Sequence, residues 1–220
     1  MKCGPHQTSH NHTAPLVAAA QPSIPVYGRY STFTIKIYIP AYPRWAYDVV
    51  LNATIAWNQA QQLWAAQSNY STPVYTFVET SETNVMSVIS FSMPSVYAGF
   101  AVGWTNYKYA ACSQTLIVET ETYPTSSVFS ADQAGNATGR HYAFWLALHE
   151  LGRVLGLGSI LDGQDIIEPR YNPERILETP RFSTLGLYAL HVLAAGSVPS
   201  FVTLPSGMSD QFTPVTEFLP

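Results

Sequence analysis

Residues 142–148 constrain the fold of this chain most strongly, because every position in the segment is apolar or aromatic. The segment belongs to a longer helical pattern over residues 140–157. A helix that is apolar on all sides is stable only when other elements surround it, so we expect this helix to run through the interior of the molecule. A chain of 220 residues can enclose such a helix, since domains of this size bury about 70 % of the surface of the unfolded chain.

Strands and helices are both expected around this segment. Residues 33–39 alternate between apolar and polar side chains, which is typical of a half-buried strand, and the strand ends at Pro40. A helix begins at Pro43, and its apolar face comprises Trp45, Val49, Ala53, Trp57, Ala60 and Trp64. Further strands are predicted at residues 74–79, 84–93, 98–109 and 115–121, and a third helix at residues 183–195.

This order of elements predicts one mixed α+β domain at residues 30–196. We expect a loose N-terminal arm at residues 1–29, where no periodicity occurs. Residues 197–220 are rich in Pro and Thr and are predicted to form a C-terminal tail.

The charge of the chain argues against a nucleic-acid partner. Lys and Arg total 10 against 14 for Asp and Glu, the net charge is −4, and no run of basic residues occurs. Proteins that bind phosphate backbones need clustered cations. No apolar stretch reaches the ~18 residues of a transmembrane helix, so no transmembrane segment is expected.

Four N-glycosylation sequons begin at Asn11, Asn52, Asn69 and Asn136. Together with the scarcity of lysine, they favour a secreted glycoprotein that lies outside the cell or at its surface, with a signal segment that is not part of this chain. Two cysteines, Cys3 and Cys112, permit a single disulfide bridge.

The sequence His149-Glu-Leu-Gly-Arg-Val-Leu-Gly-Leu-Gly-Ser159 follows the apolar segment directly. In zinc peptidases, the pattern H-E-x-x-H places two histidines on one face of a helix, where both bind one ion, and the Glu acts as general base on the zinc-bound water. The longer pattern H-E-x-x-H-x-x-G-x-x-H ends the helix at a glycine and supplies a third histidine. His149, Glu150 and Gly156 occupy their places in this pattern, whereas Arg153 and Ser159 stand at the second and third ligand positions.

On these residues the chain resembles the metzincin zinc peptidases, and among them the matrixin-like group. Asp165-Ile-Ile-Glu-Pro169 is similar to the Met-turn of the family, with Ile167 at the methionine position, and the segment from Arg181 resembles the entry to its last helix. The resemblance covers about residues 31–196. It implies a metzincin-like α+β domain with a twisted five-stranded sheet, a long backing helix, a central helix that carries His149 and a C-terminal helix.

Two of the three ligand positions hold residues that do not suit zinc. Arginine stays protonated and offers no lone pair, and zinc prefers thiolate, imidazole or carboxylate to a serine hydroxyl. We therefore expect no cofactor, and we expect Arg153 to serve as a fixed cation that pairs with Glu150, or with Asp162 or Asp165. The first functional hypothesis is a zinc-deficient pseudopeptidase that binds a peptide or protein ligand in the former substrate groove.

The second hypothesis is an active zinc-dependent endopeptidase. His149 would be the retained metal ligand and Glu150 the general base. Zn²⁺ would need further ligands from His141, from His191 or from an acidic residue at 162–168.

A binding surface is expected on the predicted strand at residues 98–109. In the family that the chain resembles, the edge strand above the zinc helix pairs with extended substrate through main-chain hydrogen bonds, a mode that needs no metal. The positions assigned to binding in this way are Ala98, Gly99, Phe100, Ala101, Val102 and Gly103. The alternative is an edge strand whose polar and bulky side chains only prevent pairing.

Overall fold

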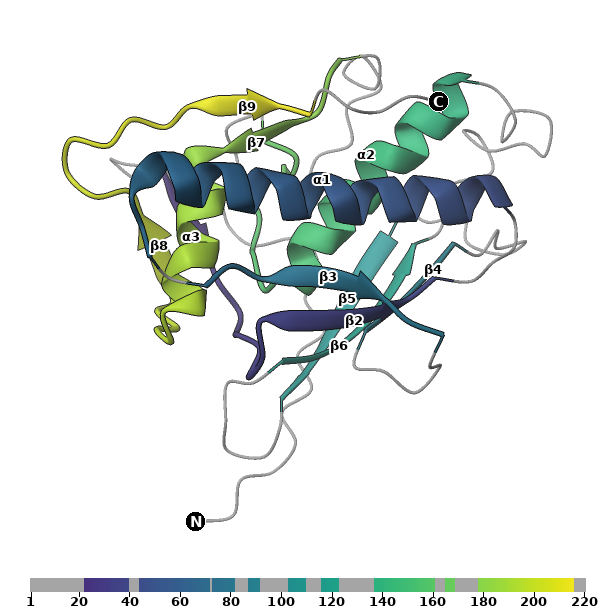
Figure 1. Cartoon of the computed structure of the whole chain (residues 1–220), viewed down its shortest axis with the longest axis horizontal. Helices are drawn as coiled ribbons and strands as arrows, with labels where there is room; N and C mark the ends of the chain where they lie inside the picture. The colour runs from purple at the N-terminus through teal and green to yellow at the C-terminus, as the bar shows by residue number, and fades with distance from the viewer. Residues whose placement is uncertain are drawn as a thin grey trace, which may run out of the picture.

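The computed structural model describes residues 22–39, 44–71, 73–81, 87–91, 103–109, 116–122, 137–160, 165–168 and 178–215. These residues form three helices and short strands in small sheets (Figure 1), so the mixed class predicted from the sequence is confirmed.

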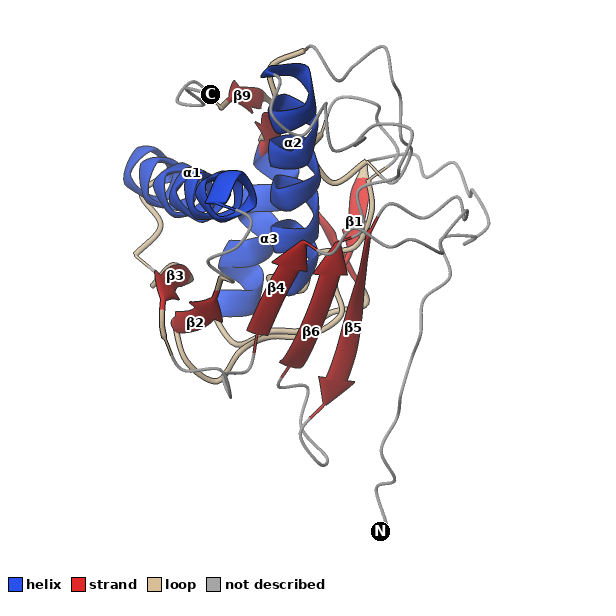
Figure 2. Ribbon diagram, turned by 90° about the vertical axis from the view of Figure 1, so that its right-hand side faces the viewer, coloured by secondary structure: helices blue, strands red, loops and turns tan. Residues whose placement is uncertain are grey.

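The largest sheet of the described part has the strand order β3-β2-β4-β6-β5. Its strands are β2 (Thr34–Tyr38), β3 (Thr76–Glu79), β4 (Ser87–Phe91), β5 (Gly103–Tyr109) and β6 (Leu116–Thr122). The pairs β2–β3, β2–β4 and β4–β6 are parallel, whereas β5 pairs with β6 in the antiparallel direction. Figure 2 shows the β5 arrow reversed beside β6 and β4, with the helices on one side of the sheet. The two edges of this sheet are therefore β3 and β5.

Helix α1 (Arg44–Ser68) packs against both β3 and helix α2 (Ala137–Val154). Its buried face includes Val49, Ala53, Trp57 and Ala60, as the apolar spacing predicts. Asn58 fixes the helix to the edge strand, because its amide donates to the Phe77 carbonyl at 3.0 Å and accepts from the Phe77 N–H at 2.8 Å.

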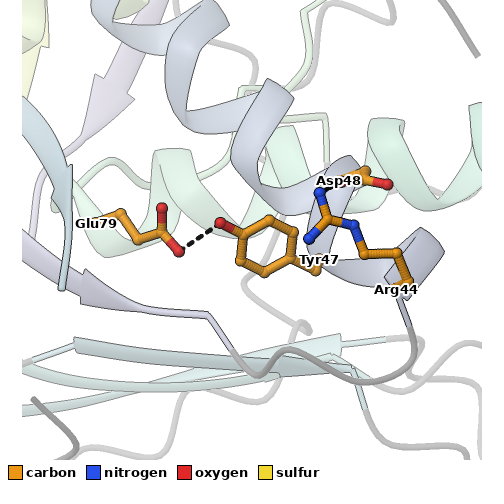
Figure 3. A network of polar contacts seen from close by, with 4 residues as sticks. All are labelled: Arg44, Tyr47, Asp48 and Glu79. Atoms are coloured by element: carbon orange, nitrogen blue, oxygen red, sulfur yellow. Dashed lines mark hydrogen bonds and ion pairs between the residues drawn. The ribbon is translucent and has the colours of Figure 1, made fainter. Parts of the chain in front are cut away.

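A polar network also joins the start of α1 to the end of β3 (Figure 3). The hydroxyl of Tyr47 donates to Glu79 at 2.6 Å, and this hydrogen bond to a carboxylate raises the pKa of Tyr47. Arg44 lies over the Tyr47 ring, 4.5 Å from its centroid, and forms an ion pair with Asp48 at 2.9 Å. These groups lie at the surface, where solvent screens such pairs and they contribute little to stability.

Helix α2 is the buried helix that the apolar segment predicts. Ala143, Phe144, Ala147 and Leu148 have no exposed surface. The indole N–H of Trp57 on α1 donates to the Leu148 carbonyl at 2.9 Å, which ties the two helices together inside the core. Helix α2 begins at Ala137 and ends at Val154, about three residues before each of the boundaries predicted from the pattern.

The predicted loose arm differs from the structure at its end. Strand β1 (Ser23–Pro25) pairs with β8 (Phe201–Thr203), and Ile24 between the two ends of β1 is fully buried. Val26 pairs with Leu157 just beyond α2, and the Gly158 N–H donates to the Pro25 carbonyl at 2.6 Å. Residues 22–29 are thus part of the packed structure: every second residue is buried, but the strand itself has only three residues, too few for its sequence to reveal the alternation.

The predicted C-terminal tail also takes part in pairing. Besides β8, it contains β9 (Phe212–Pro214), which pairs with β7 (Arg181–Ser183). Helix α3 (Thr184–Ala194) follows β7 directly, and the Ser183 hydroxyl accepts a hydrogen bond from the Gly186 N–H as the N-cap of the helix.

Candidate functional site

The end of α2 brings the last part of the motif back toward the helix. Gly156 has a φ of +94°, in the left-handed region that favours glycine. The Gly156 N–H donates to the Arg153 carbonyl at 2.8 Å, and the Leu157 N–H donates to the Gly152 carbonyl at 3.1 Å. These two bonds form a Schellman motif, which ends the helix and reverses the chain.

Arg153 and Ser159 contact each other as a result of this reversal. The Arg153 side chain, 7 % exposed, donates to the Ser159 hydroxyl through Nη2 and to the Leu157 carbonyl through Nη1 at 3.4 Å. The side chains at the second and third ligand positions of the motif therefore occupy adjacent space, and a guanidinium group lies between the helix end and the following segment.

His149 is half-buried, one helical turn before Arg153. Its Nδ1 lies 2.9 Å from the Ile166 carbonyl oxygen. A carbonyl can only accept, so Nδ1 carries the proton and the lone pair of the neutral ring is on Nε2. Metal-binding histidines are commonly oriented by a hydrogen bond of this kind.

The turn at residues 165–168 lies beneath this part of α2. Ile167 is fully buried, and a Cβ atom added at Gly152 would lie 2.8 Å from Ile167 Cγ2 and 3.0 Å from Trp57 Cζ2. A glycine at position 152 therefore allows the helix, the turn and the Trp57 ring to pack in direct contact.

Asp165 holds the turn in place. Its carboxylate, 1 % exposed, accepts from the Ile167 N–H at 3.0 Å and from the Ser183 N–H at 3.2 Å. This carboxylate thus links the turn to the entry of α3. Glu150 is buried, with 3 % exposure. Its pairing with Arg153 stays a prediction from the helical spacing. Asp162, another predicted partner of Arg153, lies outside the described residues.

The donor set of the described site does not fit the zinc ion that the resemblance implies. The second ligand position holds a guanidinium group, which has no lone pair. Nε2 of His141 lies 3.0 Å from the Glu178 carbonyl oxygen. His191, on α3, packs against the Tyr70 ring. Within the described ranges, no group of three or more His, Cys, Asp or Glu side chains is placed to hold a metal.

The predicted binding strand is only partly described. Gly103 is the first residue of the edge strand β5, which contacts α2. Ala98, Gly99, Phe100, Ala101 and Val102 lie outside the described residues.

An aromatic cluster between α1 and α3 could not be predicted from local patterns. The Tyr70 ring stacks on Trp64 at 5.3 Å and lies 4.2 Å from the His191 ring, and Tyr188 joins the group at 6.0 Å from Tyr70. Burial lowers the pKa of His191 below its usual value. Trp64 and His191 also line a small pocket with Pro73. The sequence pattern predicts Trp64 on the apolar face of the helix from Pro43 and offers His191 only as a substitute zinc ligand, so neither residue indicated this cluster.

The comparisons with known proteins give no relative, since neither a protein-family model nor a curated protein matches the chain. Among the described residues, no helix has the length and apolar character needed to cross a membrane.

Proposed function

We propose that this chain is a matrixin-like, metzincin-fold pseudopeptidase that lacks a catalytic zinc ion and binds an extended peptide or protein segment outside the cell. The hydrogen bond between Arg153 and Ser159 carries the proposal. It fills the space of two ligand positions with a buried cation and its acceptor, and a metal cation in that space would meet a fixed positive charge.

The surrounding geometry supports the same domain type. The glycine turn at Gly156, the Ile167 turn packed under Gly152 and the hydrogen bond from His149 to Ile166 keep the parts of a peptidase site in mutual contact. Because these contacts are present although two ligand positions do not suit zinc, we expect the domain to bind a ligand and not to cleave peptide bonds.

The edge strand β5 supports peptide binding. A strand at the edge of a sheet presents N–H and C=O groups on its outer side, and an extended peptide can add to it as a further strand. β5 also contacts α2, so a peptide added there would lie near the helix that carries His149.

The alternative is a working zinc endopeptidase with unconventional ligands. It rests on the neighbouring His149 and Glu150 and on the tautomer of His149, which directs a lone pair to Nε2.

Hydrolysis of a quenched-fluorescent peptide library separates the two. We expect the full chain to leave the library intact both with zinc and with a chelator. Chelator-sensitive cleavage that disappears in Glu150→Gln would establish the alternative; cleavage that persists in Glu150→Gln comes from a contaminant.

Peptide binding itself is tested by selecting binders to this chain from a displayed random peptide library. Each recovered binder is then synthesised in two versions, one with N-methyl groups at the odd-numbered residues and one with them at the even-numbered residues. In β-augmentation, every second N–H of the peptide faces the strand, so methylation in one phase should abolish binding and methylation in the other should not. Absence of binders, or equal loss in both phases, would count against the proposal.

A further inference from the structure

We propose that Asn69 is an N-glycosylation site of this chain and that Asn52, in the same helix–turn region, is not modified. The inference rests on the extracellular placement proposed above and is independent of peptide binding. Both residues begin a sequon, Asn69-Tyr-Ser71 and Asn52-Ala-Thr54.

Asn69 is presented outside regular structure. Helix α1 ends at Ser68, and Asn69 is exposed with a φ of +58°, the left-handed conformation that asparagine tolerates better than most residues. Ser71, which supplies the sequon hydroxyl, is also exposed and belongs to no helix or strand. The amide and the hydroxyl are therefore both accessible on the folded surface.

The middle residue of this sequon holds the turn in one place. Tyr70 stacks on Trp64 with ring centroids 5.3 Å apart and contacts His191 at 4.2 Å. Because the tyrosine ring is anchored in this cluster, the flanking Asn69 and Ser71 remain at the surface in a fixed position.

The Asn52 sequon lies in the interior of α1. Thr54 is 4 % exposed, and its hydroxyl donates to the Leu51 carbonyl at 2.7 Å. Once α1 has formed, this hydroxyl is bound within the helix and is inaccessible to an enzyme. The structure thus distinguishes two sequons that the sequence pattern treats alike.

The donor for this modification is a lipid-pyrophosphate-linked oligosaccharide. Nδ2 of Asn69 forms a bond to the anomeric carbon of the first sugar, the bond from that carbon to the phosphate oxygen breaks, and the lipid pyrophosphate leaves with the electron pair. The amide gives up one proton, so the product is a neutral glycosyl amide.

The test uses the full chain secreted from eukaryotic cells behind an added leader. Deglycosylation by a peptide amidase in heavy-oxygen water converts an occupied Asn into labelled Asp, which mass spectrometry locates. Chymotrypsin is the protease of choice, since no Lys or Arg lies between Arg44 and Lys108, whereas Trp57 and Trp64 separate the two sequons. We expect label at residue 69 in most molecules and none at residue 52.

Ser71→Ala and Ser71→Thr form the matched pair of variants, because both leave Asn69 and its backbone conformation in place. Ser71→Ala should remove one glycan, while Ser71→Thr should retain it, with unchanged near-UV circular dichroism in both. A secreted, folded chain without label at residue 69, or with equal label at residues 52 and 69, would overturn the inference. Peptide-binding results have no bearing on either outcome.

Discussion

The guanidinium group of Arg153 donates a hydrogen bond to the hydroxyl of Ser159 across the turn at Gly156. The contact joins the two motif positions at which a zinc peptidase would carry histidines. The contact shows that the side chains at positions 153 and 159 lie in one region. His149 lies four residues before Arg153 and therefore on the same face of α2. If the chain has the proposed metzincin-like fold, two of its three ligand identities differ from the family pattern, while the side chains at those two positions still lie together.

The double substitution Arg153→His with Ser159→His is therefore expected to create a zinc site. Three imidazoles would then face one region, with His149 already oriented by the Ile166 carbonyl. Elemental analysis after purification without chelators should give about one additional zinc per chain relative to the parent. Thermal unfolding should shift upward with zinc in the double variant only.

The parent chain is the control for this experiment, because it carries the same N-terminal histidines at residues 6, 10 and 12. Each single substitution should bind zinc less tightly than the double variant. A folded double variant with no more zinc than the parent would mean that the three positions do not share a common point.

Long periodic elements could be predicted from the sequence, and short ones could not. The continuous apolar surface of residues 142–148 requires an enclosed helix, and α2 is such a helix. Strands β1 and β8 have three residues each, too few for an alternating pattern to be recognised in the sequence. Each becomes a strand only through its hydrogen-bonded pairing with the other. Their pairing depends on segments about 180 residues apart, which local propensity does not encode.

The candidate site divides in the same way. The reversal at Gly156 and the proximity of positions 153 and 159 follow from the helix-ending glycine in the motif. The hydrogen bond from His149 to Ile166 and the two roles of Asp165 depend on how a turn packs under the helix, so the sequence indicated the turn without its contacts.

Asp165→Ala is expected to destabilise the fold by about 3 kcal/mol, because two buried backbone N–H groups lose a charged acceptor. Asp165→Asn keeps the volume and one acceptor oxygen, so it should lose roughly half as much. Urea unfolding followed by tryptophan fluorescence measures both. An alanine variant within about 0.5 kcal/mol of the parent would show that the turn does not need the carboxylate.

Gly152→Ala should destabilise the protein although alanine is the better helix former. The new methyl group would lie 2.8 Å from Ile167 Cγ2 and 3.0 Å from the Trp57 ring, and overpacking of about 1 to 3 kcal/mol outweighs a gain of about 1 kcal/mol in helix propensity. In an Ile167→Met background, which removes Cγ2, the loss should be smaller. Equal losses in the two backgrounds of this double-mutant cycle would assign the strain to Trp57 alone.

The stability of the aromatic cluster should depend on pH through His191. Burial lowers the pKa of His191 in the folded state, so the unfolded chain takes up this proton at a higher pH than the folded one. The free energy of unfolding is then expected to fall as the pH drops below the usual histidine value of about 6.5. The Tyr70 and Tyr188 rings pack against His191, with ring centroids 4.2 Å and 5.9 Å from it.

His191→Phe keeps an aromatic ring in the cluster and removes the titrating group. Urea unfolding at about pH 8 and about pH 5 should show a smaller loss of stability on acidification in this variant than in the parent. Tyr188→Phe is the matched control, since it changes the same cluster and leaves His191 in place, and it should retain the parental pH dependence. If His191→Phe and the parent lose the same free energy between the two pH values, protonation of the cluster does not contribute to acid sensitivity.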